Sequence, residues 1–216
     1  MIKAIIFDLD GTLLNTLIDL NISVNYALKS QNYPYRDLEH TRRSIGNGVA
    51  KLIERSVPEN TPVEEYKKTL KIFEEHYKIH YQDNTIPYRD VFNLLKILKQ
   101  EGYLLAVCTN KLQDVAVLLI EKFFPKVFDI IQGDVPELKK KPDPSMINSV
   151  ISRFGIQKNE CLYIGDTNVD EETAVSSGLD YYLVTYGYRT KDELKEMCPK
   201  AKMVDTCEEL FNELKR

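Results

Sequence analysis

The feature of this sequence that most constrains its fold is the alternation of short apolar runs with amphipathic segments. Five runs have the length and residue types of buried β-strands: residues 3–7, 103–108, 128–131, 161–164 and 181–184. Apolar residues at helical spacing mark four further segments: residues 112–122, 144–154, 168–177 and 207–215. Because buried strands alternating with helices form a parallel sheet, the chain is predicted to have an α/β fold with helices on both faces of the sheet.

One interval, residues 8–102, breaks this alternation. It is far longer than the usual connection between two parallel strands. Apolar residues recur within it at helical spacing: Leu20, Val24 and Leu28, followed by Val49, Leu52, Ile53 and Val57. The sequence therefore predicts a sheet core formed by residues 1–15 and 86–216, with a helical cap domain inserted at residues 16–85.

The composition disfavours several classes of protein. The net charge is −4 and no basic cluster stands out, so no nucleic-acid partner is predicted. No apolar run approaches the roughly 20 residues that span a bilayer, and the N-terminus lacks the pattern of a signal peptide. The four cysteines show no metal-ligand spacing and suit reduced thiols, and Cys108 and Cys161 lie in apolar runs that favour burial. These features predict a cytoplasmic protein with no membrane partner, and they leave its oligomeric state open.

The first strand runs directly into a group of reactive residues, Asp8-Leu9-Asp10-Gly11-Thr12. A strand period of two places Asp8 and Asp10 on the same side. One of two such carboxylates can attack phosphorus, while the other gives a proton to the leaving oxygen and later takes one from water. Gly11 permits a tight turn and Thr12 offers a hydroxyl, so both are candidates for phosphate binding. The alternative interpretation is an acidic turn that only closes the strand.

Two more acids follow the fourth run, at Asp166 and Asp170. Their spacing of four places them on one face of a predicted helix. Carboxylates aimed at the end of the first strand would repel one another without a cation, and hard oxygen ligands beside a phosphate favour Mg²⁺. Asp8, Asp10, Asp166 and Asp170 are therefore the candidate metal ligands. Alternatively, acids at a helix start only stabilise the helix dipole.

Polar residues also end the second run, and a lysine lies in a later turn. Thr109 and Asn110 offer hydroxyl and amide groups at the carboxyl end of a buried strand, where open α/β sheets bind their ligands. Lys141 precedes a proline and is predicted to reach the same edge as a point charge. Thr109, Asn110 and Lys141 are candidates for phosphate binding, whereas Lys139 and Lys140 are interpreted as a solvated turn.

In their order along the chain, these residues resemble the four motifs of the haloacid dehalogenase-like hydrolase superfamily. Residues 8–12 match the first motif, Thr109 the second, Lys141 the third, and Gly165 with the two acids after it the fourth. The resemblance covers nearly the whole chain. It implies a Rossmann-like core with an inserted helical cap.

The resemblance also implies a mechanism. Asp8 would be the nucleophile that becomes a phosphoaspartate, and Asp10 would be the general acid and then the general base. Mg²⁺ would be held by the Asp8 carboxylate, the Asp10 backbone carbonyl and Asp166, with Asp170 supporting or ligating it. The phosphate-binding candidates of the second and third motifs would hold the phosphoryl group.

Within the superfamily, the chain is most similar to phosphoglycolate phosphatases and related small-molecule phosphatases. The segment around Gly46 and Asn47 resembles a glycine-containing cap segment of that group, which makes both residues candidates for substrate specificity. The nearby Arg42 and Arg43 are candidates to bind a substrate carboxylate, the alternative being a charged helix face. Asn15 departs from the pattern, since many relatives have an acid there.

The sequence thus predicts a Mg²⁺-dependent phosphatase that acts on a small anionic phosphorylated metabolite similar to 2-phosphoglycolate. Pyrophosphatase, nucleotidase and sugar-phosphate mutase activities are alternatives, because cap residues decide among them. A dehalogenase is disfavoured, since it would not need Asp10 as a proton donor to a leaving alcohol. A non-enzymatic phosphate-binding module would have lost catalytic residues, and none is lost.

A second candidate metal site is weaker. His76 and His80 are four residues apart on a predicted helix, which is a metal-ligand spacing. No further cysteine or histidine lies near them in the sequence. A solvated helix face is therefore the preferred interpretation.

Overall fold

The computed structural model describes residues 1–215 and divides the chain into two compact units. The first unit comprises Met1–Leu14 and Pro87–Arg216, and the second comprises Asn15–Ile86. A separate two-stranded sheet pairs β2 (Leu14–Asn15) with β3 (Ile86–Pro87), at the two places where the chain passes from one unit to the other. No helix within residues 1–215 is both long and apolar enough to cross a membrane.

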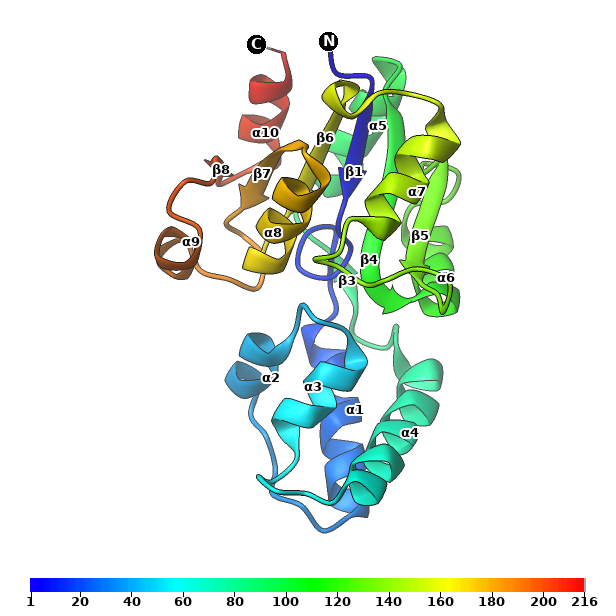
Figure 1. The fold of residues 1–216 in the computed structure, drawn as a ribbon, viewed down its shortest axis with the longest axis vertical. Coiled ribbons are helices and arrows are strands. Elements are labelled where there is room, and N and C mark those ends of the chain that lie inside the picture. Colours follow the sequence, from blue (N-terminus) through cyan, green and yellow to red (C-terminus); the bar gives the residue numbers. More distant parts are fainter. Residues whose placement is uncertain (216) are drawn as a thin grey trace. The chain divides into compact units, whose positions relative to one another are not determined.

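A six-stranded sheet forms the centre of the first unit (Figure 1). Its order is β5-β4-β1-β6-β7-β8, and every neighbouring pair is parallel. The strands are β1 (Ala4–Phe7), β4 (Leu104–Leu112), β5 (Ile130–Asp134), β6 (Cys161–Gly165), β7 (Asp180–Val184) and β8 (Met203–Val204). The predicted α/β, Rossmann-like fold is therefore confirmed.

Helices cover both faces of this sheet (Figure 1). Those of one face are α5 (Val91–Gln100), α6 (Gln113–Phe123) and α10 (Cys207–Leu214); those of the other are α7 (Ser145–Phe154) and α8 (Asn168–Ser177). The face under α7 and α8 has a continuous apolar core that joins Met146 and Val150 of α7 to Ile6, Ala106 and the Tyr163 ring of the strands. Right-handed crossovers place helices on opposite faces when the chain turns back across the sheet, as it does after β5.

Two strands of the first unit differ from the sequence prediction by more than one residue at a bound. β4 continues through Thr109 and Asn110 to Leu112, with a shift of register against β5 between Cys108 and Leu112. β5 begins at Ile130, two residues later than predicted, and just before it the Asp129 carboxylate accepts a hydrogen bond from Leu105 N at 2.8 Å. Thr109 and Asn110 therefore lie within β4, whereas the sequence analysis placed them just after the strand.

Several short elements within residues 1–215 were not predicted. Among them are the helix α9 (Lys191–Met197) and the short strands β2, β3 and β8. A sequence signal for α9 exists, because Thr190 and Glu193 form a reciprocal capping box at its start. β8 has only two residues and offers no period to detect.

The second unit is helical. It contains α1 (Leu17–Ser30), α2 (Leu38–Ser44), α3 (Val49–Ser56) and α4 (Val63–His80). Buried side chains from several of these helices form its interior: Leu20, Val24 and Leu28 of α1, Leu52 and Ile53 of α3, and Phe73 and Tyr77 of α4. The unit therefore has an apolar core of its own.

Candidate active site

The carboxyl ends of three adjacent strands bring the predicted motifs together in the first unit. Phe7 of β1 pairs in register with Val107 of β4 and with Ile164 of β6. Asp8 follows β1 directly, and Asp166 follows β6. Carboxylate oxygens of Asp8, Asp166 and Asp170 all lie within 4.8 Å of one another, and all three residues are buried.

Lys141 places a buried ammonium among these carboxylates. Its Nζ lies 2.9 Å from Asp8 Oδ1, and it donates hydrogen bonds to Asp170 Oδ1 at 2.8 Å and to the Tyr163 hydroxyl at 2.9 Å. Asn110 fixes the backbone beneath it, since its side-chain amide donates to Lys141 O at 3.0 Å and accepts from Lys141 N at 2.8 Å. Asn110 thus acts on Lys141 through hydrogen bonds that sequence spacing does not reveal.

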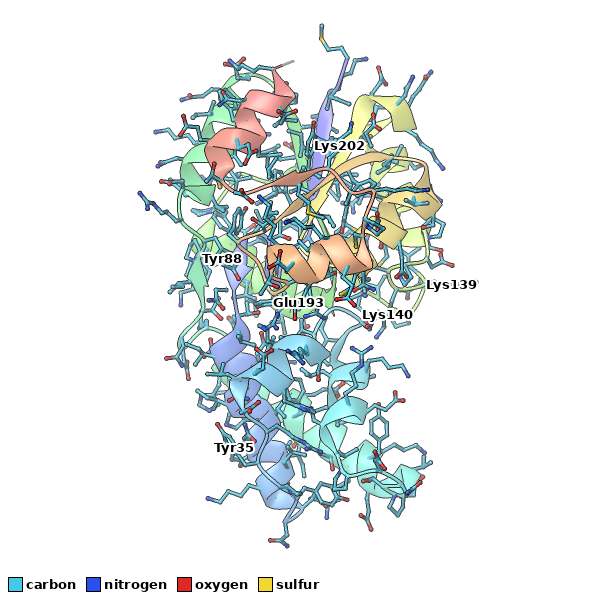
Figure 2. All side chains as sticks on the ribbon, turned by 90° about the vertical axis from the view of Figure 1, so that its left-hand side faces the viewer. Tyr35, Tyr88, Lys139, Lys140, Glu193 and Lys202 are labelled. Atoms are coloured by element: carbon cyan, nitrogen blue, oxygen red, sulfur yellow. The ribbon has the colours of Figure 1, made fainter. Side chains whose placement is uncertain are left out.

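The two preceding lysines lie in different surroundings. Lys139 has 81% of its side chain exposed and lies 3.8 Å from Asp143, while Lys140 is 40% exposed and pairs with Asp134 at 2.7 Å. Figure 2 labels both residues at the surface of the first unit. Of these three consecutive lysines, only Lys141 joins the cluster of carboxylates.

Asp170 is the most heavily hydrogen-bonded of these acids. Its Oδ2 accepts from Asp166 N (3.1 Å), Thr167 N (3.0 Å) and Thr167 Oγ1 (2.8 Å), while its Oδ1 accepts from Lys141 and from the Tyr163 hydroxyl (3.0 Å). Burial raises the pKa of this carboxyl, but Lys141 and the hydrogen bonds outweigh burial, so its pKa is lowered. Asp170 is therefore held as an anion that orders the start of α8.

Asp166 is clamped on two sides. Its Oδ1 accepts from Thr12 Oγ1 at 3.1 Å and its Oδ2 from Tyr188 N at 2.7 Å. A Cβ atom added at Gly11 or at Gly187 would overlap the Asp166 side chain, so both positions need glycine. Burial, and then the charges of Asp170 and Asp8, raise the pKa of Asp166 well above its usual range. The Asp166 side chain is therefore fixed in a position where its ionised form is disfavoured.

Asp8 shows the same electrostatic stress. Burial, opposed by Lys141 and reinforced by the charges of Asp170 and Asp10, raises the pKa of Asp8 to about 7. Its buried Oδ1 has no hydrogen-bond partner within residues 1–215, so the contact with Lys141 is ionic without good hydrogen-bond direction. Three crowded carboxylates with one such oxygen fit a divalent cation, because a hard cation would offset their repulsion.

Asp10 lies beside a lysine that the sequence analysis did not select. Lys111 Nζ is 2.9 Å from Asp10 Oδ1 and 3.0 Å from Asp10 Oδ2, and only 3% of the Lys111 side chain is exposed. The sequence feature that could have identified Lys111 is its position directly after Thr109 and Asn110, in a strand adjacent to β1. Because lysine side chains are usually exposed to solvent, a buried lysine at position 111 was not expected from the sequence.

The hydroxyls predicted for phosphate binding have protein partners. Thr12 Oγ1 donates to Asp166, and Thr12 O accepts from the Tyr186 hydroxyl at 3.3 Å. Thr109 Oγ1 accepts from Lys111 N at 3.3 Å, and Thr109 is 2% exposed. The segment after β7, which includes Tyr186 and Tyr188, therefore supports the first motif, and the sequence analysis gave it no role.

The predicted specificity residues lie in the second unit. Arg42 donates to both oxygens of Glu39 at 2.7 Å, and Arg43 donates to Glu39 Oε1 at 2.6 Å. Gly46 has a φ of 123°, a conformation that favours glycine. Asn47 Oδ1 accepts from Arg55 Nη2 at 2.8 Å. These contacts order the loop and leave its role in specificity a prediction.

The two histidines of α4 form a ring stack. The His76 ring lies 4.0 Å from the Tyr26 ring and 4.3 Å from the His80 ring, measured between centroids. His76 Nδ1 contacts Ser23 Oγ at 3.0 Å, and His80 Nδ1 contacts Asp83 Oδ2 at 2.7 Å. Stacking and these polar contacts account for their spacing. All four cysteines are free and buried, which includes the predicted burial of Cys108 and Cys161.

Comparisons with known proteins agree with this geometry. The family model of haloacid dehalogenase-like hydrolases matches residues 5–184. The phosphoglycolate phosphatase of Mesorhizobium japonicum is 33% identical over 201 residues, which cover 91% of this chain and 88% of that protein. The phosphoglycolate phosphatase of Aliivibrio fischeri is 32% identical over 205 residues, covering 92% and 90%.

A solved structure shows the same fold. The crystal structure of a predicted phosphoglycolate phosphatase from Haemophilus somnus has a TM-score of 0.88 and 29% identity, and the match covers 100% of this chain and 98% of that one. The motifs, the sheet order and the family match all agree. This chain belongs to the haloacid dehalogenase-like hydrolases.

Proposed function

We propose that this protein is a Mg²⁺-dependent phosphatase that hydrolyses a small phosphate monoester, similar to 2-phosphoglycolate, through a phosphorylated Asp8. The observation that carries the proposal is the buried Asp8 carboxylate at the end of β1, 2.9 Å from Lys141 and within 4.8 Å of Asp166. The Lys141 ammonium beside this nucleophile can pair with the negative charge of a phosphoryl group.

The two aspartates of the first motif have separate tasks in this mechanism. The Asp8 carboxylate attacks phosphorus, and the bond from phosphorus to the ester oxygen breaks. Asp10 gives its proton to that leaving oxygen, then takes a proton from the water that attacks the phosphoaspartate. Inorganic phosphate leaves and Asp8 is regenerated. Lys141, already in contact with Asp8, binds the phosphoryl oxygens together with Thr109.

Asp8, Asp166 and the backbone carbonyl of Asp10 would hold Mg²⁺. When bound, the cation would neutralise the charge that collects around the phosphoryl group. Asp170 supports this arrangement from behind, because its two oxygens already accept five hydrogen bonds. Residues 16–85 act as the substrate-selecting cap in this proposal, with Arg42, Arg43, Gly46 and Asn47 as the candidate specificity residues.

The test is the initial rate of phosphate release across a substrate panel. The panel contains 2-phosphoglycolate, pyrophosphate, nucleoside monophosphates, sugar phosphates and an aryl phosphate, each with Mg²⁺ or with EDTA. We expect Mg²⁺-dependent release that is lost in Asp8→Asn and greatest with a small monoester. Best activity on pyrophosphate or on a nucleotide would replace the substrate assignment. Release that persists in Asp8→Asn would refute the covalent mechanism.

A further inference from the structure

The second unit contains a pocket that no residue of the candidate active site lines. Its volume is about 660 Å³, which is in the usual range for sites that bind small molecules. All of its lining residues lie between Arg36 and Tyr66, around α3 and at the start of α4. The pocket therefore belongs to one compact unit of the chain.

Arg36 is fixed at this pocket by neutral oxygens. Its backbone N–H donates to Asn25 Oδ1 at 2.8 Å, and its guanidinium donates to Ser56 O at 2.7 Å and to Val57 O at 3.4 Å. A guanidinium has five N–H groups, so three of them remain for another partner. Carbonyl oxygens orient the guanidinium without cancelling its charge, and Arg36 is thus a preorganised cation.

Arg55 joins the pocket to the loop between α2 and α3. It donates from Nη1 to Ser44 O at 2.7 Å and from Nη2 to Asn47 Oδ1 at 2.8 Å. These two acceptors lie on either side of Gly46, whose φ of 123° favours glycine. The ring of His40, which also lines the pocket, contacts Arg55 O through Nε2 at 3.0 Å. One guanidinium therefore lines the pocket and holds the loop.

The charges around the pocket favour an occupant with a single negative charge. Within residues 1–215, neither Arg36 nor Arg55 forms an ion pair. Of the two glutamates that also line the pocket, Glu54 pairs with Lys51 at 2.7 Å. In the described part of the chain, two guanidinium charges thus share the pocket with one carboxylate, Glu59, that has no cation of its own. Guanidinium groups bind a carboxylate through two parallel hydrogen bonds.

Apolar groups form the rest of the lining. The Val63 side chain is apolar although Val63 is 65% exposed, and Val57 lies beside it in the lining. The Tyr66 hydroxyl already donates to Ala50 O at 3.0 Å, so the Tyr66 ring is the part that an occupant can cover. An occupant with an apolar body would remove these groups from water.

We propose that this pocket binds a small organic carboxylate with an apolar body, and that Arg55 couples its occupancy to the loop between α2 and α3. The carboxylate pairs with the guanidinium groups of Arg36 and Arg55. Because it draws on the guanidinium that holds Asn47, ligand and loop affect each other, and the coupling is reciprocal. The inference goes beyond the proposed function, since it involves neither a phosphate ester nor a residue of the candidate active site.

The site is tested with benzoate and its neutral analogue benzamide, by ligand-observed NMR titration of the full chain. We expect a Kd of about 10 mM or lower for benzoate. Benzamide should bind about tenfold more weakly, and Arg55→Met should remove that difference. Glu59→Gln should tighten benzoate binding about two- to fivefold, because it removes a like charge at an exposed position. Arg89→Met is the matched control, since Arg89 is an exposed arginine of the first unit that pairs with Asp90.

The coupling is tested by the same titration in Asn47→Ala. This change removes the acceptor of Arg55 Nη2 and leaves that group to the ligand. We expect benzoate to bind about threefold more tightly, the effect of one neutral hydrogen bond. In the Arg55→Met background, Asn47→Ala should leave the Kd of benzoate unchanged.

Three results would overturn the inference. Equal binding of benzoate and benzamide to the wild type would exclude a carboxylate site. An unchanged Kd for benzoate in both Arg55→Met and Glu59→Gln would exclude this pocket, and it would leave the arginines with a purely structural role. An unchanged Kd in Asn47→Ala would exclude the coupling. None of these titrations measures phosphate release, so failure of the proposed function is a separate result.

Discussion

Lys141 donates to Asp170 across 2.8 Å, and Asp170 in turn accepts from the backbone N–H groups of Asp166 and Thr167. The phosphate-binding lysine of the proposed mechanism and the loop that would hold the cation are thus joined through one carboxylate. The four predictions on the first unit below follow from this connection and from the groups around it.

The first prediction concerns Asp170. Asp170→Asn keeps the size of the side chain but replaces one acceptor oxygen by a donor, which would face either Lys141 or the N–H groups of the α8 start. Outer partners of a metal site typically affect affinity or activity 10–100-fold. We expect kcat to fall within about that range and the Mg²⁺ concentration for half-maximal activity to rise. Steady-state rates over a Mg²⁺ titration measure both. An unchanged Mg²⁺ dependence would remove the supporting role.

The second prediction concerns the buried Tyr163 hydroxyl. It accepts from Lys141 at 2.9 Å and donates to Asp170 at 3.0 Å. Tyr163→Phe keeps the ring but leaves both partners short of a hydrogen bond, which costs about 1–3 kcal/mol in a buried site. We expect a lower melting temperature and a kcat reduced roughly tenfold. Tyr181→Phe is the control, because it removes a partly exposed hydroxyl that donates to Glu171. Equal effects of the two variants would contradict the prediction.

The third prediction concerns Gly187. A methyl group there would overlap the Asp166 side chain and the Gly11 carbonyl oxygen, so the loop must shift. We expect Gly187→Ala to lose at least about 90% of activity, because a small misplacement of a binding group costs up to 100-fold. Gly178→Ala is the comparison, since nothing lies within 4 Å of its added Cβ, although its φ of 72° carries a strain of about 1 kcal/mol. Activity close to wild type in Gly187→Ala would show that the clamp on Asp166 is dispensable.

The fourth prediction is a pH dependence of stability. Burial raises the pKa of Asp8 from 3.8 to about 7, so the folded protein holds a proton more tightly than the unfolded chain. In EDTA, this group's contribution to the free energy of unfolding is complete below about pH 4. It is lost as the pH rises toward about 7, by roughly 4 kcal/mol at most. Melting temperatures across this range measure the loss.

Two controls isolate Asp8 in that experiment. Asp8→Asn cannot ionise, so its stability curve should be flatter than that of the wild type between about pH 4 and 7. Asp192→Asn changes an exposed aspartate and should leave the curve as it is. Adding Mg²⁺ should recover stability at pH 7 in the wild type more than in Asp8→Asn. Parallel curves for wild type and Asp8→Asn would refute the assignment to Asp8.

The fifth prediction concerns the second unit. The buried Asp19 carboxylate of α1 accepts from Asn84 N, Asn84 Nδ2 and Thr85 Oγ1 at 2.8–3.0 Å. Asp19→Ala removes all of these acceptors and should lower the free energy of unfolding by about 2–4 kcal/mol. Asp37→Ala removes one cap bond to His40 N on an exposed surface and should cost about 1 kcal/mol. Chemical denaturation measures both, and equal losses would contradict the prediction.

The sequence by itself determined five of the six strands of the main sheet, most of the helices and the placement of the acids. A short apolar run such as residues 161–164 is expected to form a buried strand. A polar residue that follows such a strand must then lie at the edge of the sheet. That is why Asp8, Thr109 and Asp166 were expected at one edge. The capping pattern of Thr190 and Glu193 was also present and was overlooked.

Only the tertiary structure decided which side chains pair. Lys111 meets Asp10 because β4 lies beside β1, although 101 positions separate the two residues in sequence. Thr12 and Tyr188 both reach Asp166 for the same reason, since the first motif and the segment after β7 flank the end of β6. Propensity and period act over a few residues, whereas these contacts depend on strand order and on how closely glycines allow the backbones to approach.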